Sequence, residues 1–406
     1  MTVALRAPAA VRAVELTGAG SDVDLARAGE PYRTALLVAT ENGRPLAAVA
    51  VDTEGAAVFD ASLARAVLRS AAPGEVPPQG VVAERTDGGH PRVSVVVTTC
   101  ARAEDVADTV ASVLACDPAP LEVVVVENRP GGSRVAAALA DRFGGDPRVR
   151  CVPEQRRGLS WARNAGLAAA RGELVAFTDD DVRVDAGWIG WIERAFDSEP
   201  GAACVTGLIM PAELETPAQV LLEQYAGFGK GFARRVHRPD APTGPLFPYA
   251  AGEFGSGANT AMRTGIARAL GGFDAALGAG TPAHGAEDLD LYVRVLLAGH
   301  AIVYEPAALL WHTHPDTSPR LRSEVFRYGV SLTAMMTKLA LHGHAGAIAR
   351  RALAALRFLR DPASRKNERK RADYPRALDR WEYLGMLCGP LAYLHSRVVT
   401  RRLERA

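Results

Sequence analysis

The chain has 406 residues, of which 48% are hydrophobic and 23% charged, enough apolar mass for a sizeable core and for two or three domains. Its 47 Lys and Arg nearly balance its 46 Asp and Glu, and the formal net charge of +1 argues against a strongly basic nucleic-acid binder and an acidic disordered chain. The charges are unevenly distributed. Residues 316–406 carry 19 basic and 8 acidic residues, which leaves 28 and 38 for the first 315. The sequence therefore predicts an acidic body followed by a basic extension.

Cysteine spacing and hydropathy indicate the cellular compartment in which the protein is expected. The five cysteines are scattered and show no C-x-x-C spacing, which argues against a disulfide framework or structural zinc site and suits a reducing cytoplasm. The first residues lack the continuous apolar stretch of a signal peptide, and no run of 18 apolar residues could span a bilayer. We expect a cytoplasmic protein without a membrane-spanning helix.

Residues 1–88 show the pattern of a small α+β module. Two apolar runs flank Asn42-Gly43, the strongest short hairpin signal, because a type I′ turn needs positive φ at both central residues. A short helical pattern and the turn-rich stretch 72–89 follow. No residue of this module points to a particular chemistry, so its role stays open.

Residues 89–315 alternate apolar strand patterns with helical patterns. Val93–Thr98, Leu121–Val126 and Leu174–Phe177 are short continuous apolar runs separated by amphipathic segments. Such runs predict an α/β domain with a mostly parallel sheet that helices cover on both faces. The ligand crevice of such a sheet lies beyond the carboxyl ends of its strands.

Three adjacent carboxylates, Asp179, Asp180 and Asp181, follow the third of these strands. Carboxylates so close together repel one another unless a cation binds them, and hard oxygen ligands suit Mg²⁺ or Mn²⁺. In an extended segment Asp179 and Asp181 would project to one side. The alternative interpretation is a surface cluster of aspartates that starts a helix.

A second acidic pair, Glu287-Asp288, begins a segment with helical apolar spacing that ends near Gly299. Carboxylates in the first turn of a helix are favoured by its dipole, so the pair also has a purely structural interpretation. Further along, His312 follows a strand-like run, where a histidine serves equally well as a metal ligand or in a capped turn.

Taken together, these segments resemble family 2 glycosyltransferases of the GT-A fold. The resemblance covers roughly residues 92–315, and seven elements agree in order and spacing: VSVVVTTCAR, VVVVENRPGG, GLSWARNAGLAAARGELVAFTDDDV, GSGANTAMR, LGGFD, GAEDLDLYVRVLLAGH and WHTH. It implies a Rossmann-like, mostly parallel sheet and an inverting, metal-dependent transfer of sugar from a nucleotide-diphosphate sugar, with UDP-sugar as the first choice. The acceptor is not identified by these motifs.

The resemblance also implies roles for residues at the first two strand ends and in the following helix. Thr99 and Arg102 correspond to the loop that contacts the nucleotide, although TTCAR departs from the common family form. Glu127 stands where the family usually has an aspartate that contacts the base or ribose. Arg163 and Asn164 match a motif beside the donor pyrophosphate.

The acidic segments match the family's metal and catalytic positions. Within the D-x-D motif, Asp181 is the expected ligand of Mn²⁺ or Mg²⁺, whereas Asp179 and Asp180 are candidates for donor contacts. The resemblance also makes Asp179 and His312 candidate metal ligands. Of the acidic pair Glu287-Asp288, Asp288 matches the catalytic base that removes a proton from the acceptor hydroxyl.

Residues 316–406 predict a basic helical extension that includes the run Arg365–Arg371. One interpretation is a helical layer docked on the acidic body. Another is peripheral contact with an anionic membrane at its inner face. We do not expect nucleic-acid binding, because no aromatic stacking platform accompanies the basic run.

Two other functions compete with sugar transfer. A nucleotidyl- or phosphotransferase could use a similar acidic site, but the chain has no G-x-x-x-x-G-K loop after its first strand. A non-catalytic nucleotide-sugar-binding protein would be expected to lose metal or base positions, whereas Asp181 and Asp288 are both present.

Overall fold

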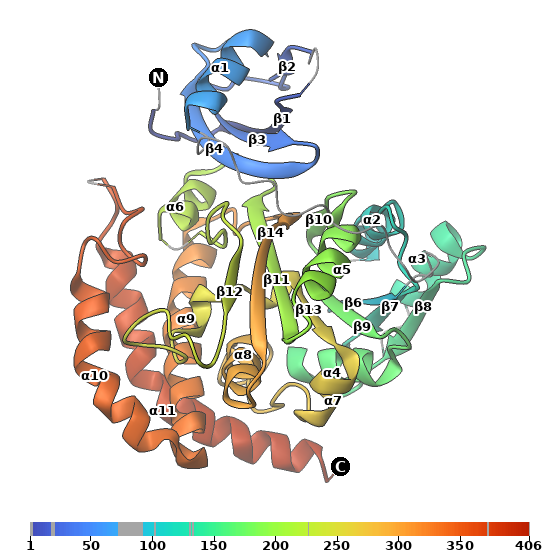
Figure 1. The fold of residues 1–406 in the computed structure, drawn as a ribbon, viewed down its shortest axis with the longest axis vertical. Helices are drawn as coiled ribbons and strands as arrows, with labels where there is room; N and C mark the ends of the chain where they lie inside the picture. The colour runs from blue at the N-terminus through green and yellow to red at the C-terminus, as the bar shows by residue number, and fades with distance from the viewer. Residues whose placement is uncertain are drawn as a thin grey trace.

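A computed structural model describes residues 3–17, 21–71, 92–100, 103–129, 131, 134–225, 227–371 and 373–405. The chain forms a small N-terminal module, a central α/β body and a layer of long C-terminal helices along one side of that body (Figure 1). Arg102 lies outside the described residues.

The N-terminal module is a three-stranded sheet covered by one helix. Strand β3 (Thr34–Glu41) pairs in parallel with β1 (Ala9–Glu15) and antiparallel with β4 (Arg44–Asp52). Positive φ angles of 51° at Asn42 and 74° at Gly43 confirm the predicted tight turn. Helix α1 (Ala61–Ala71) and a two-stranded pair, β2 (Val23–Asp24) with β5 (Val58–Phe59), complete the module.

The central sheet has the strand order β10-β14-β11-β13-β9-β6-β7-β8, and β12 also pairs with β14. Its strands are β6 (Val93–Thr99), β7 (Glu122–Glu127), β8 (Val149–Pro153), β9 (Leu174–Asp179), β10 (Val182–Val184), β11 (Ala202–Pro211), β12 (Arg235–His237), β13 (Thr260–Arg263) and β14 (Ala301–His312). Strands β9, β6, β7 and β8 are parallel neighbours, as are β11 and β14, whereas β13 runs antiparallel between β11 and β9. The predicted α/β class with a mostly parallel sheet is confirmed.

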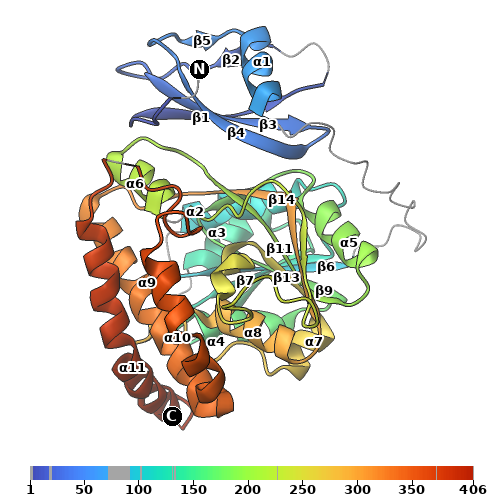
Figure 2. The ribbon, with the colours of Figure 1, turned by 60° about the vertical axis from the view of Figure 1, so that its left-hand side comes forward.

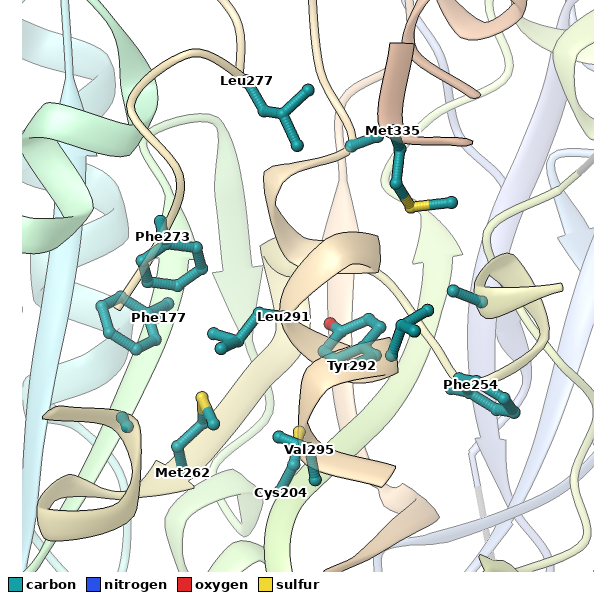
Figure 3. Packing of buried hydrophobic residues seen from close by; sticks show 14 of the residues in the cluster. Phe177, Cys204, Phe254, Met262, Phe273, Leu277, Leu291, Tyr292, Val295 and Met335 are labelled. Carbon is teal, nitrogen blue, oxygen red and sulfur yellow. The ribbon is translucent and has the colours of Figure 1, made fainter. Parts of the chain in front are cut away.

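Alternating residues of the buried strands supply the cores on the two faces of this sheet. Val95 and Val97 face α2 (Ala103–Leu114), α3 (Arg134–Phe143) and α5 (Trp188–Ser198). Val96 faces the opposite core, which includes α4 (Leu159–Ala169), α7 (Thr264–Ala269) and α8 (Glu287–Leu297). Figure 3 shows Leu291 and Tyr292 of α8 packed between side chains of the sheet and Met335 of the C-terminal layer. Packing on the sheet and on the C-terminal layer fixes helix α8 in place, which positions the acidic pair at its N-terminus.

The remaining short elements are α6 (Pro217–Tyr225) and the 3₁₀ turns Ala251–Glu253 and Gly257–Asn259. The C-terminal layer consists of α9 (Ser318–Leu339), α10 (Ala345–Arg360) and α11 (Ala377–Leu403), and a π-type turn at Ala340–His344 joins the first two (Figure 2).

A seam of three glycines lets α9 and α11 pack backbone to backbone. A Cβ atom at Gly329 would lie 2.0 Å from the Glu382 carbonyl oxygen, and one at Gly385 would lie 2.1 Å from that of Phe326. At Gly389 it would lie 2.0 Å from the Thr333 hydroxyl. Only glycine therefore permits this close approach.

Ion pairs attach the C-terminal layer to the body and to itself. The Lys338 ammonium lies 2.6 Å from Asp290 and 3.1 Å from Asp274 in the body. Within the basic run, Lys366 binds Glu382 at 2.5 Å and Lys370 binds Asp379 at 2.6 Å. These contacts favour the interpretation in which the basic extension docks on the protein. Among the described residues, no helix is long and apolar enough to cross a membrane.

Candidate active site

A cleft of about 2080 Å³, the central cleft, opens at the carboxyl ends of β6, β7 and β9. Thr99, Asn128 and Asp179 line it from these strand ends, as expected for an α/β sheet. The cleft extends to walls formed by α9 and α10. Typical ligand pockets enclose about 300–1,000 Å³, so this cleft has room for two substrates.

The aspartate triplet lies on the floor of the cleft. Strand β9 ends at Asp179, and Asp180 and Asp181 form the turn into β10, so all three line the cleft. Burial raises the pKa of Asp180 to about 6; a hydrogen bond with Thr99 opposes that rise, and the charges of Asp181 and Asp179 add to it. Burial also raises the pKa of Asp181. Carboxyl groups that resist ionisation together are typical of a site that receives a cation.

Pairing between β10 and β14 brings His312 to the triplet. Val182 is the register partner of His312, and the His312 Nε2 atom lies 3.4 Å from Asp181 Oδ1. The His312 Nδ1 atom is buried and has no hydrogen-bond partner. The second histidine of the segment, His314, is occupied elsewhere because its Nε2 atom lies 2.8 Å from Glu223.

Arg163 of α4 links the two acidic segments from beneath the cleft. Its side chain is 2% exposed, and it donates hydrogen bonds to Glu287 at 2.6 Å and to Asp179 at 3.1 Å. Burial raises the pKa of Glu287, and the Arg163 guanidinium opposes that rise. A buried arginine with two carboxylate partners fixes their relative positions, since each partner would otherwise be an unpaired buried charge.

Asp288 lies next to this ion pair and faces the cleft. Its Oδ2 atom accepts a hydrogen bond from the Gly257 backbone at 2.6 Å, and its Oδ1 atom accepts one from the Leu289 backbone at 2.8 Å. A Cβ atom at Gly257 would lie 2.9 Å from that of Asp288 and 2.5 Å from an Arg163 nitrogen. The GSGANT loop therefore contributes a backbone donor at a position that no side chain could occupy.

The loop that leads into α8 contains two non-glycine residues with left-handed backbones. His284 has a φ of 66°, and Ala286, the residue before the acidic pair, has a φ of 64°. Such conformations cost free energy in residues with a Cβ and persist where the surrounding structure enforces them. Their place beside Asp288 is consistent with a functional constraint on this loop.

The donor set and charge of the cleft fit a divalent cation. Five carboxylates line the cleft together with one buried guanidinium, that of Arg163. They are Asp179, Asp180, Asp181, Glu287 and Asp288. Asp181 and His312 bring an oxygen and a nitrogen atom to within 3.4 Å of each other, whereas the carboxylate of Asp179 lies against Arg163. In the described ranges no three His, Cys, Asp or Glu side chains form a complete cage, so a substrate would have to supply further ligands.

Two residues that are expected to contact the donor lie differently from that expectation: one does not line the cleft, and the other makes hydrogen bonds within the protein. Glu127 is buried at the end of β7 and is not among the residues that line the cleft. Asn164 donates to the carbonyl oxygen and accepts from the amide of Phe273, each at 2.8 Å, and so holds the GGFD loop. Donor contacts by these two residues and by the undescribed Arg102 remain predictions.

The structure adds two cations that the sequence interpretation did not include. Both line the central cleft: Lys230 lies between α6 and β12, and Arg235 is the first residue of β12. The glycine-rich motif GFGKG at 227–231 could have indicated this part of the site from the sequence, since glycine-rich loops can approach a ligand closely.

Comparison with known sequences identifies the family. Residues 90–330 match the family described as glycosyltransferase-like family 2, which is more than half of the chain. The chain belongs to this family, and the GT-A fold expected from its motifs is confirmed.

Individual relatives share only part of their length with this chain. It is 27% identical over 255 residues to the pre-mycofactocin glycosyltransferase of Mycobacterium tuberculosis, covering 63% of this chain and 48% of that protein. It is 35% identical over 123 residues to the glucosyl-dolichyl phosphate glucuronosyltransferase of Haloferax volcanii, covering 30% and 39%. The alignments thus span less than half the length of these relatives. Among solved structures, a mannosyltransferase from Pyrobaculum calidifontis in complex with GDP-Man and Mn²⁺ aligns with a TM-score of 0.47 and 19% identity, over 80% of this chain and 92% of that one.

Proposed function

We propose that this protein transfers a sugar from a nucleotide-diphosphate sugar to an acceptor hydroxyl, with inversion at the anomeric carbon. One observation carries the proposal: Arg163 joins the aspartate triplet and the Glu287-Asp288 pair into one site on the wall of a cleft with room for two substrates. The names of relatives, a glucuronosyltransferase and a pre-mycofactocin glycosyltransferase, support sugar transfer as the reaction class.

Asp181 and His312 would hold Mn²⁺ or Mg²⁺, and Asp179 is a further candidate once a donor is bound. Bound there, the cation would neutralise charge that develops on the departing diphosphate. Thr99 and Asp180 lie beside this position and are the candidates for ribose or phosphate contacts. Arg163 keeps Asp179 and Glu287 in place while these groups bind.

Asp288 is the proposed catalytic base. Its two backbone hydrogen bonds orient the carboxylate and leave lone pairs free to accept a proton from the acceptor hydroxyl. The new bond joins the acceptor oxygen to the anomeric carbon, the bond from that carbon to the diphosphate oxygen breaks, and the nucleoside diphosphate leaves with the electron pair. Glu287 cannot easily take this role, because Arg163 occupies its carboxylate.

The test measures nucleoside diphosphate release from UDP-, GDP- and dTDP-sugars, with Mn²⁺ and after its removal by a chelator. We expect release from one donor class only with the metal, with UDP-sugar as the first choice. Asp288→Asn should lower the turnover by at least about 10²-fold with donor binding unchanged. Asp316→Asn, an exposed carboxylate outside the cleft, is the matched control. Full turnover in Asp288→Asn would overturn the assignment of the base, and the absence of metal-dependent release from any donor would overturn the function.

We also propose that the outer face of α11 contacts an anionic membrane surface. This face exposes a stripe of large apolar side chains at helical spacing: Trp381, Leu384, Leu387, Leu391, Leu394 and Val398. Leu387 is 78% exposed and Leu391 74%. Every exposed charged residue of α11, a helix described throughout, is an arginine. A second copy of this face would bring like charges together, whereas anionic lipid complements both the stripe and the arginines.

Vesicle sedimentation tests this contact. We expect the protein to bind phosphatidylcholine vesicles that contain about 30% phosphatidylglycerol and to be released by high salt. Leu387→Asp combined with Leu391→Asp should abolish binding. Leu297→Asp, on the exposed side of α8, is the control because Leu297 is 45% exposed and lies on another helix. Equal binding of both variants would contradict the proposal.

A further inference from the structure

Helix α10 presents an apolar face that the protein itself covers only in part. None of its 16 residues is buried. Yet Ile348, Ala352, Ala355 and Leu359, spaced as one face of a helix, line the central cleft. Leu332 and Met336, one turn apart on α9, line the same cleft. An apolar wall that is left open inside a substrate cleft is the kind of surface to which an apolar part of a ligand binds.

Two cations without partners line the same cleft. Neither the Lys230 ammonium nor the Arg235 guanidinium has a hydrogen bond or ion pair with any described residue. Burial lowers the pKa of Lys230 to about 8, the charge of Arg369 adds to this effect, and Glu223, Glu253 and Asp288 oppose it. Both side chains are half-buried on the cleft wall, so an anion bound in the cleft would supply these cations with a partner that the described chain does not provide.

The C-terminal layer holds this cationic segment in place. Arg369 donates a hydrogen bond to the Gly229 carbonyl oxygen at 2.7 Å, and Arg365 lies 4.0 Å from Glu253. A Cβ atom at Gly227 would lie 2.0 Å from an Arg369 nitrogen. The segment 227–235 and the loop that carries Arg365 and Arg369 therefore form one joined wall, with positive groups from both.

We propose that the acceptor is an amphiphile: an anionic group, phosphate or carboxylate, binds Lys230 and Arg235, and an apolar chain or ring system lies along α10. The inference rests on the proposed function and names its acceptor class. Four features support it: the volume of the cleft, the unpaired cations, the open apolar wall and the continuity of both with Asp288.

Binding of octyl phosphate to the full chain, without donor, tests the proposal by calorimetry and thermal shift below the micelle concentration. Three further probes each change one feature of octyl phosphate. Octanoate carries a carboxylate in place of the phosphate, octanol has the chain without a charge, and inorganic phosphate has the charge without a chain. We expect octyl phosphate or octanoate to bind at least about tenfold more tightly than octanol and inorganic phosphate.

The variants test each half of the proposed site. Lys230→Gln combined with Arg235→Gln should remove the preference for the charged probe, and Ile348→Glu should weaken binding at least about tenfold. The controls are Arg357→Gln and Leu353→Glu, two residues of α10 that do not line the cleft. Both controls should bind the probe as the unaltered chain does.

Three results would overturn the inference: equal binding of octanol and octyl phosphate, binding unchanged in Ile348→Glu, or a Lys230 and Arg235 variant that loses nucleoside diphosphate instead of the probe. The last result would assign these cations to the donor. Because probe binding needs no turnover, amphiphile binding without sugar transfer would count against the proposed function alone.

Discussion

The N-terminal module and the C-terminal helices both pack on the same α/β body, but only the C-terminal helices line its cleft. Leu36 and Val38 of the N-terminal sheet meet Leu208, Leu309 and Trp311 of the body in an apolar cluster. The C-terminal helices contact the body through apolar residues such as Met335 and through the buried ion pair of Lys338 with Asp290, and they form a wall of the central cleft. Within the described chain, none of the residues that line that cleft belongs to the N-terminal module. The N-terminal module therefore packs on the body without reaching its cleft, whereas the C-terminal helices also form part of the cleft wall.

The largest effect on stability should come from the ion pair between the C-terminal layer and the body. Lys338→Met leaves Asp290, which is 0% exposed, without its 2.6 Å partner. Arg294 remains at 2.8 Å, so we expect a loss of about 3 kcal/mol in the free energy of unfolding, the lower end for a broken buried pair. Urea unfolding measures it, with the exposed Arg350→Met as control. A loss below about 1 kcal/mol would mean that this attachment is not structural.

The N-terminal interface should affect stability without affecting catalysis. Leu36→Ala removes a side chain that is 8% exposed from the apolar cluster, at a cost of about 2 kcal/mol. Donor turnover, measured well below the melting temperature, should stay within about twofold. Leu63→Ala, an exposed position of the same module, is the control. A fall in turnover without a fall in stability would show that this module acts on the site.

One buried histidine of the body should make its stability depend on pH in mild acid. His237 on β12 is 1% exposed, and neither ring nitrogen has a hydrogen-bond partner. Burial lowers its pKa from 6.5 to about 4, and the charges of Arg235 and Arg365 add to this. The folded state then binds fewer protons than the unfolded state, so stability falls as the pH drops below 6.5.

Between pH 7 and pH 5 this linkage amounts to about 1.8 kcal/mol. The variant His237→Phe should remove that part of the pH dependence, since Phe254 already lies against the ring with centroids 4.8 Å apart. Melting temperatures at the two pH values measure it. Residues 1–88 contain no histidine, so the N-terminal module should not respond in this range. An unchanged pH dependence in the variant would assign the effect to another group.

The smallest effect concerns the strained loop before α8. Ala286→Gly relieves a left-handed backbone and should raise the free energy of unfolding by up to about 1 kcal/mol. It should also lower kcat, because the backbone two residues before Asp288 becomes more flexible and the carboxylate is then held less firmly in the cleft. Ala298→Gly at the other end of the helix, where φ is −80°, is the control and should gain nothing. An unchanged kcat would show that the strain does not serve the base.

Local sequence signals were sufficient for the sheet and for the acidic residues of the cleft. Continuous valine runs mark β6 and β7, and the aspartate triplet stands at a strand end, where chain order alone predicts a crevice. The contacts that Asn164 makes, and those that hold the loop around Lys230, have no such signal. Asn164 holds Phe273, 109 residues away, and the loop of Lys230 is held by Arg369, 140 residues from Gly229. Contacts between residues so far apart in the sequence depend on tertiary packing, which leaves no local pattern of apolar and polar residues from which they could be predicted.

The glycine seam between α9 and α11 acts on the cleft from a distance. Glu382, whose carbonyl lies at that seam, holds Lys366 in the loop that carries Arg365 and Arg369. A methyl group at Gly329 or Gly385 would push α11 outward and draw that loop away from the segment 227–235. The width of this side of the cleft thus depends on two glycines that do not line the cleft themselves.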